Sequence, residues 1–83
     1  MDEATEHSRL KWQCRRGMLE LDTLLLRFLQ DGYSTLDAEH REVFVKLLDT
    51  PDTELLEYLM GRLEHKEVRS QYVINAIRTS PDH

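Results

Sequence analysis

Residues 18–30 read MLELDTLLLRFLQ, and this stretch decides the class of fold. Its apolar side chains recur at positions i, i+3, i+4, i+7 and i+8, which places them along one face of an α-helix. The residues of this stripe are Leu21, Leu24, Leu25, Phe28 and Leu29. The stretch is therefore predicted to form an amphipathic helix whose apolar face needs other elements to cover it.

The same spacing predicts helices on both sides of this stretch. They cover residues 8–14, 37–49, 51–63 and 66–78. The last two are predicted to be buried through Leu55, Leu56, Leu59, Met60 and Leu63, and through Val68, Tyr72, Val73, Ala76 and Ile77, respectively. No segment alternates with period two, so no strand is expected. The predicted fold class is all-α, a single compact bundle of about five short helices.

Particular residues mark the predicted helix boundaries. Gly17 interrupts the pattern and indicates a bend or junction after the first helix. Gly32 is expected to end the next helix in the left-handed conformation, followed by a loop over residues 33–36. Asp37 is a suitable N-cap, and Thr50 is expected to cap the helix whose first turn holds Pro51.

The length and composition limit the possible functions. The chain has 83 residues, so residues 1–83 are expected to form one domain, with residues 1–7 and 79–83 mobile. A formal net charge of −5 disfavours nucleic acid as a partner. With a single cysteine and no apolar run long enough to insert into a membrane, the chain is expected to be a cytoplasmic, bacterial protein.

No residue pattern predicts chemistry within the chain. The four histidines lack the spacing of a zinc site, and no glycine-rich phosphate-binding loop is present. Glu20 and Asp22 stand two apart on a helix and point to different faces, so they are poorly placed to share a substrate. We therefore expect no enzyme activity, no metal and no stably bound cofactor.

The segment Arg15-Arg16-Gly17-Met18-Leu19-Glu20 is the most unusual part of the chain. Spacing alone favours an ordinary ion pair between Arg16 and Glu20, four residues apart, beside a bend at Gly17. The alternative is a binding surface, because arginine, exposed tryptophan and methionine are typical of protein interfaces. Both interpretations stay open on physical grounds.

This segment resembles the R-G-x-x-E motif of the small succinate dehydrogenase assembly factors, which promote covalent flavinylation. The match reads Arg16-Gly17-Met18-Leu19-Glu20, continues to Asp22 and is preceded by Arg9-Leu10-Lys11-Trp12. Further similarity lies at Phe44, Leu47, Leu48, Pro51, Asp52, Leu59 and Met60, so the resemblance covers residues 9–78. Tyr58 stands where many members of that family have tryptophan.

The resemblance implies a chaperone-like factor that binds the flavoprotein subunit of succinate dehydrogenase, and also that of fumarate reductase. FAD would belong to this partner, in which a histidine nitrogen attacks the 8α-methyl carbon of the flavin. The implied partner contacts are Arg16, Gly17 and Glu20, with Arg15, Met18, Trp12 and Arg9 beside them. The free factor is expected to be monomeric. The alternative is an antitoxin-like or regulatory protein-binding module unrelated to flavin.

Overall fold

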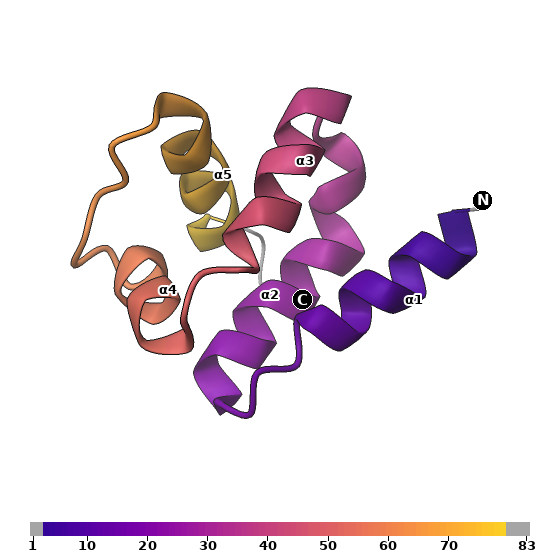
Figure 1. Ribbon diagram of the computed structural model, residues 1–83, viewed down its shortest axis with the longest axis horizontal. Helices are drawn as coiled ribbons and strands as arrows, with labels where there is room; N and C mark the ends of the chain where they lie inside the picture. The colour runs from indigo at the N-terminus through magenta and orange to yellow at the C-terminus, as the bar shows by residue number, and fades with distance from the viewer. Residues whose placement is uncertain (1–2, 80–83) are drawn as a thin grey trace.

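The computed structural model describes residues 3–79 and contains helices only (Figure 1). The elements are α1 (Glu3–Gln13), α2 (Leu19–Asp31), the 3₁₀ turn η1 (Tyr33–Thr35), α3 (Ala38–Leu47), α4 (Asp52–Leu59) and α5 (Val68–Arg78). No strand occurs in this part of the chain. The prediction of an all-α bundle with five helices is confirmed.

The stripe of α2 forms the centre of the core. Leu21, Leu25 and Phe28 are almost fully buried, and the Phe28 ring lies 5.4 Å from the ring of Phe44 on α3. Burying each such side chain contributes roughly 1.5–3 kcal/mol to folding, so this stripe supplies much of the stability. Leu24, which was also predicted to belong to this stripe, lies at its edge and is only partly buried.

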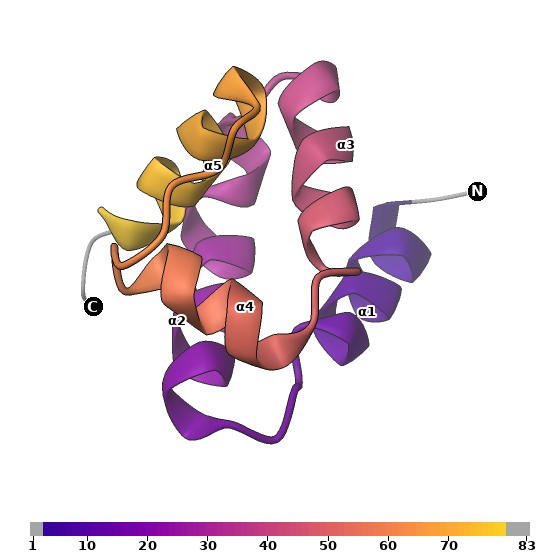
Figure 2. The same cartoon turned by 60° about the vertical axis from the view of Figure 1, so that its left-hand side comes forward.

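Helix α5 packs against α2, α3 and α4, whereas α1 makes its main contact with α2. Figures 1 and 2 both show the N-terminal end of α1 projecting away from the other helices. Leu10 and Cys14, near the other end of α1, are buried in the common core. The short connection after Cys14 leads to Met18, which is half-buried and packs against the same core.

Helix α4 ends earlier than predicted, at Leu59 instead of residue 63. Gly61 adopts φ +80°, its N–H donates to the carbonyl of Tyr58, and the N–H of Arg62 donates to the carbonyl of Glu57. These two bonds are the Schellman arrangement that closes a helix. Because the chain turns there, the prediction that Leu63 is buried is wrong, and its side chain is exposed.

Other boundary predictions also need correction. Gly32 has φ −113° and ends α2 without a left-handed residue, because the chain continues directly into η1. Thr50 does not cap α4, whose N-cap is Pro51. Asp37 does cap α3, since its carboxylate accepts the backbone N–H of His40 at 2.9 Å.

The first and last helices also differ from the prediction, in where α1 begins and in which face of α5 is buried. Helix α1 begins at Glu3, ahead of the predicted start at residue 8. Val68 and Tyr72, predicted to be buried, are exposed on α5 because its packed face runs through Ser70, Val73, Ile74 and Ile77. Of the residues expected to be mobile, 1–2 and 80–83 lie outside the described residues, whereas residues 3–7 belong to α1.

Candidate functional site

The Arg16 side chain is bound within the chain. Its Nε donates to Asp52 Oδ1 at 2.7 Å and its Nη2 donates to the carbonyl of Thr50 at 2.9 Å. Its Nη1 donates to the carbonyls of Leu48 at 2.6 Å and Gln13 at 3.0 Å. The side chain is only 15% exposed, so the guanidinium group joins the end of α1 to the connection between α3 and α4.

The predicted ion pair between Arg16 and Glu20 is not formed. Arg16 precedes α2 and turns toward Asp52, while Glu20 lies exposed in the first turn of α2. The backbone N–H of Arg16 donates to Asp22 Oδ1 at 2.6 Å. Asp22 therefore anchors the main chain of Arg16, and Asp52 anchors its side chain.

Gly17 is the bend that the sequence predicts, and it adopts φ +85°. This left-handed conformation favours glycine because a side chain would clash with its own backbone. A Cβ atom built on Gly17 would have no atom of a non-adjacent residue within 4 Å. The space over Gly17 is therefore open to a binding partner.

Trp12 and Arg15 form an exposed pair before Gly17. Trp12 is 76% exposed, and the guanidinium carbon of Arg15 lies 5.9 Å from the centre of its ring. A cation stacked on an indole ring at this distance is held by a cation–π attraction. Together with Ser8 and Lys11, these two residues line a shallow hollow of about 220 Å³. The predicted contact Arg9 is exposed on the same helix.

A second hollow is lined mostly by residues that closely follow Gly17 in the sequence. It has a volume of about 350 Å³ and lies between the start of α2 and the end of α4, lined by Leu19, Glu20, Thr23, Leu24 and Met60. Leu19 is 83% exposed, which is unusual for leucine and leaves apolar surface in water. Met18, the remaining predicted contact, is half-buried.

Cys14 lies beneath this surface and is fully buried. Burial raises the pKa of its thiol from 9.0 to about 11, and the nearby Arg16 charge offsets this only in part. A thiol with so high a pKa is a poor nucleophile near neutral pH. Cys14 is therefore a core residue. Within residues 3–79, no cluster of histidine, cysteine and acidic side chains is arranged to hold a metal ion.

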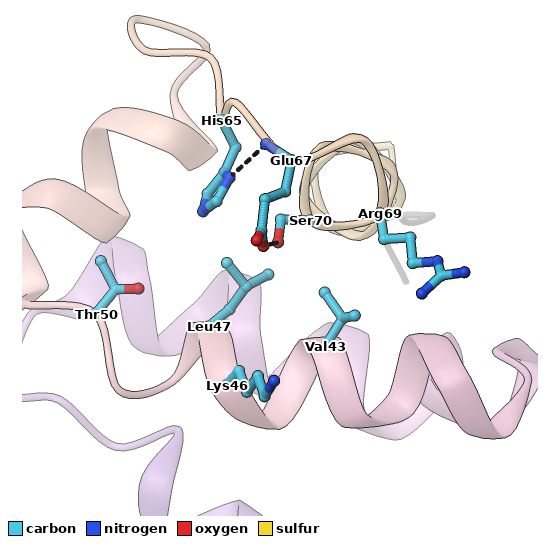
Figure 3. A pocket seen from close by; sticks show the side chains of 8 residues that line it. All are labelled: Val43, Lys46, Leu47, Thr50, His65, Glu67, Arg69 and Ser70. Atoms are coloured by element: carbon cyan, nitrogen blue, oxygen red, sulfur yellow. Dashed lines mark hydrogen bonds between the residues drawn. The ribbon is translucent and has the colours of Figure 1, made fainter.

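A further pocket of about 300 Å³ lies between α3 and the start of α5 (Figure 3). Some of its polar groups are hydrogen-bonded or ion-paired within the chain. The N–H of Glu67 donates to His65 Nδ1 at 3.1 Å, and Ser70 Oγ donates to Glu67 Oε1 at 3.3 Å. Arg69 turns away from the pocket and pairs with Glu39 at 2.8 Å. None of the predicted site residues lines this pocket.

Several residues of the site were not predicted as site residues, among them Asp22, Asp52, Leu19 and Met60. Leu19 and Asp22 belong to the extended motif, and Asp52 and Met60 belong to the further similarity to the family, so all four carried a signal in the sequence. Asp52 stands 36 residues from Arg16, and nothing in the local pattern pairs the two.

The comparisons with known proteins address this same region. A family model described as the flavinator of succinate dehydrogenase matches residues 8–81, including the whole segment from Arg9 to Glu20. The chain belongs to this family. The family predicted from the R-G-x-x-E motif is thereby confirmed, and its role in flavin attachment favours the assembly-factor interpretation over the antitoxin-like alternative.

Individual relatives of the flavinator family match over nearly their full length. The FAD assembly factor SdhE of Coxiella burnetii is 37% identical over 78 residues, which cover 94% of this chain and 95% of that protein. The proteins of the same name from Pseudomonas putida and Pseudomonas aeruginosa are 43% and 42% identical over 77 and 84 residues. These matches cover 93% and 99% of this chain, and 92% and 100% of the respective relatives. None of the helices in residues 3–79 is long and apolar enough to span a membrane.

Proposed function

We propose that this member of the flavinator family binds the flavoprotein subunit of succinate dehydrogenase and promotes covalent attachment of FAD to it. The binding site is the surface around the connection from α1 to α2. Its residues, called the motif surface below, are Arg9, Trp12, Arg15, Gly17, Met18, Leu19 and Glu20. The observation that carries the proposal is the open space over Gly17, flanked by exposed Trp12 and Leu19 on a chain of this family.

Each exposed group has a role that suits a protein partner. A partner backbone approaches Gly17, where no side chain obstructs it. Trp12 and Leu19 contribute apolar area, and such anchors commonly dominate the affinity of an interface. Glu20 accepts a partner arginine or backbone N–H groups, and Arg15 pairs with a partner carboxylate.

Arg16 has a different role in this proposal from the one that the motif suggested. Its guanidinium group has acceptors inside the chain for each of its three nitrogens. Breaking these bonds to reach a partner would leave Asp52 without its counter-charge and carbonyl oxygens without donors, which is unfavourable in a partly buried site. Arg16 therefore supports the motif surface from within.

The factor acts by docking and carries no catalytic group of its own. FAD stays with the flavoprotein, whose own groups make the bond, and the factor holds the subunit in an arrangement that favours the reaction. The same docking extends to the flavoprotein of fumarate reductase. The free factor is a monomer of the bacterial cytoplasm, where its flavoprotein partners are assembled.

Co-expression of the flavoprotein subunit with Glu20→Ala tests the proposal. The expected result is a large loss of covalently bound flavin, read as in-gel fluorescence of the denatured subunit, because Glu20 contributes to the interface. Glu42→Ala on α3 removes the same charge from an exposed site elsewhere and should leave the fluorescence unchanged. Circular dichroism verifies that both variants are folded. Wild-type fluorescence with folded Glu20→Ala would count against the motif surface.

A further inference from the structure

The four side-chain bonds of Arg16 reach three separate parts of the chain. They end on the last residue of α1, on two carbonyls after α3 and on the first residue of α4. An arginine side chain has five N–H donors, so most of its bonding capacity is used by these acceptors. The group fastens the connection from α1 to α2 onto the connection from α3 to α4.

Asp52 supplies the one negative charge among these acceptors. The other three are carbonyl oxygens of Gln13, Leu48 and Thr50. The Arg16 side chain is 15% exposed and that of Asp52 is 37% exposed, so the pair is partly shielded from water. A charged hydrogen bond in such a site is stronger and more directional than one on an open surface.

The segment that this pair fastens is the one that presents the motif surface. Gly17 follows Arg16 directly, and a Cβ atom built on it would meet no atom of a non-adjacent residue within 4 Å. Met18, the N-cap of α2, makes no side-chain cap bond. The carbonyl of Met18 accepts the N–H of Asp22 at 2.8 Å, and the Met18 side chain packs against the core. The position of Arg16 and Gly17 therefore depends mainly on Asp22, which binds the Arg16 main chain, and on Asp52, which binds its side chain.

We propose that Asp52 is a positioning residue for partner binding. It acts through Arg16 and holds Gly17 and Glu20 in the arrangement that the flavoprotein recognises, without contacting the flavoprotein. A binding loop that is ordered before the encounter loses less conformational entropy on binding, and this raises the affinity. The inference rests on the proposed function, since it concerns how the same motif surface is held.

The affinity of the purified factor for the purified flavoprotein subunit, measured by isothermal titration calorimetry, tests the inference. Asp52→Ala is expected to weaken binding roughly tenfold, within the range of coupling between residues of one network. Glu54→Gln, on the exposed face of the same helix turn, loses one charge and serves as the matched control with unchanged affinity. If Asp52→Ala does not fold, Asp52→Asn keeps the shape and removes only the charge.

A double substitution distinguishes positioning from a direct partner contact. In the Arg16→Met background, Asp52→Ala should cause no further loss of affinity, because its only route to the surface has already been removed. Hydrogen exchange in residues 15–19 should rise in Asp52→Ala, while exchange in α5 stays at the wild-type rate. A merely structural role would raise exchange throughout the core instead.

The outcomes separate this inference from the proposed function. Wild-type affinity of Asp52→Ala together with weak binding of Glu20→Ala would overturn the positioning role and leave the motif surface intact. The positioning role would also be overturned if Asp52→Ala weakened binding by the same factor in the Arg16→Met background as in the wild type. Asp52 would then act independently of Arg16. Wild-type affinity of both Asp52→Ala and Glu20→Ala would overturn the proposed binding surface itself.

Discussion

Arg16 and Gly17 are neighbours in the chain with different kinds of surroundings. The Arg16 side chain lies against Asp52 and three carbonyl groups, and Gly17 faces open solvent in a left-handed conformation. Within the motif, Arg16 thus supports the surface from inside, whereas Gly17 leaves space on the surface for a partner. Substitutions at the two positions should therefore impair binding for different physical reasons.

A series at Gly17 separates backbone strain from occupied space. Gly17→Ala is expected to reduce the free energy of unfolding by about 1 kcal/mol, because alanine is strained at positive φ. Gly17→Asn should reduce it less, since asparagine tolerates this conformation. Urea denaturation measures both.

Partner affinity of the same series gives a second readout. Gly17→Arg places a long side chain in the space over the loop and should abolish binding, even though a Cβ atom there meets nothing within the chain. If Gly17→Arg is folded and binds like Gly17→Ala, the open space over Gly17 has no role in recognition.

At the scale of helices, the sequence was sufficient where the signal is local. The apolar stripe predicted α2, and Asp37 predicted the start of α3, because periodicity and capping involve residues a few positions apart. The burial of Val68 and Tyr72 was predicted wrongly, since the packed face of α5 depends on how α2, α3 and α4 surround it. Hydrophobic spacing does not contain that information.

Prediction of the candidate site was likewise limited to signals that are local in the sequence. The sequence predicted most of the exposed motif residues as partner contacts, because they lie in a short stretch that resembles the family motif. It could not identify the partners of Arg16, because Asp52 is 36 residues away and the other acceptors are main-chain carbonyls, which every residue has. The fold therefore decides whether this arginine faces inward or outward.

Leu19 and Leu21 provide a matched pair within the first turn of α2. Leu21 is fully buried and Leu19 is 83% exposed. Leu21→Ala should reduce the free energy of unfolding by about 2–5 kcal/mol through the lost contacts and the cavity. Leu19→Ala should change it by less than about 0.5 kcal/mol, as is usual for surface sites.

The order of effects should be reversed for partner binding. At a temperature where both variants are folded, Leu19→Ala should weaken the affinity for the flavoprotein more than Leu21→Ala does, because only Leu19 offers apolar surface to a partner. Thermal denaturation and calorimetry on the same samples measure the two quantities. A Leu19→Ala variant that binds like wild type would remove the apolar hollow from the interface.

At the scale of the whole molecule, the helices divide between support and recognition. Helices α2 to α5 enclose the core, and α1 is joined to them through Leu10 and Cys14 with its N-terminal end projecting outward (Figure 2). The motif surface lies where α1 meets this body. A second exposed apolar area lies on α5, at Val68 and Tyr72, where the Tyr72 ring is 4.6 Å from that of His40.

These two areas are the rival docking faces, and hydrogen exchange on the complex distinguishes them. The factor is mixed with an excess of the flavoprotein subunit, and amide exchange is compared with that of the free factor by mass spectrometry. Binding through the motif surface predicts slower exchange in residues 12–20 and unchanged exchange in residues 66–74. Protection of residues 66–74, with residues 12–20 exchanging as in the free factor, would contradict it.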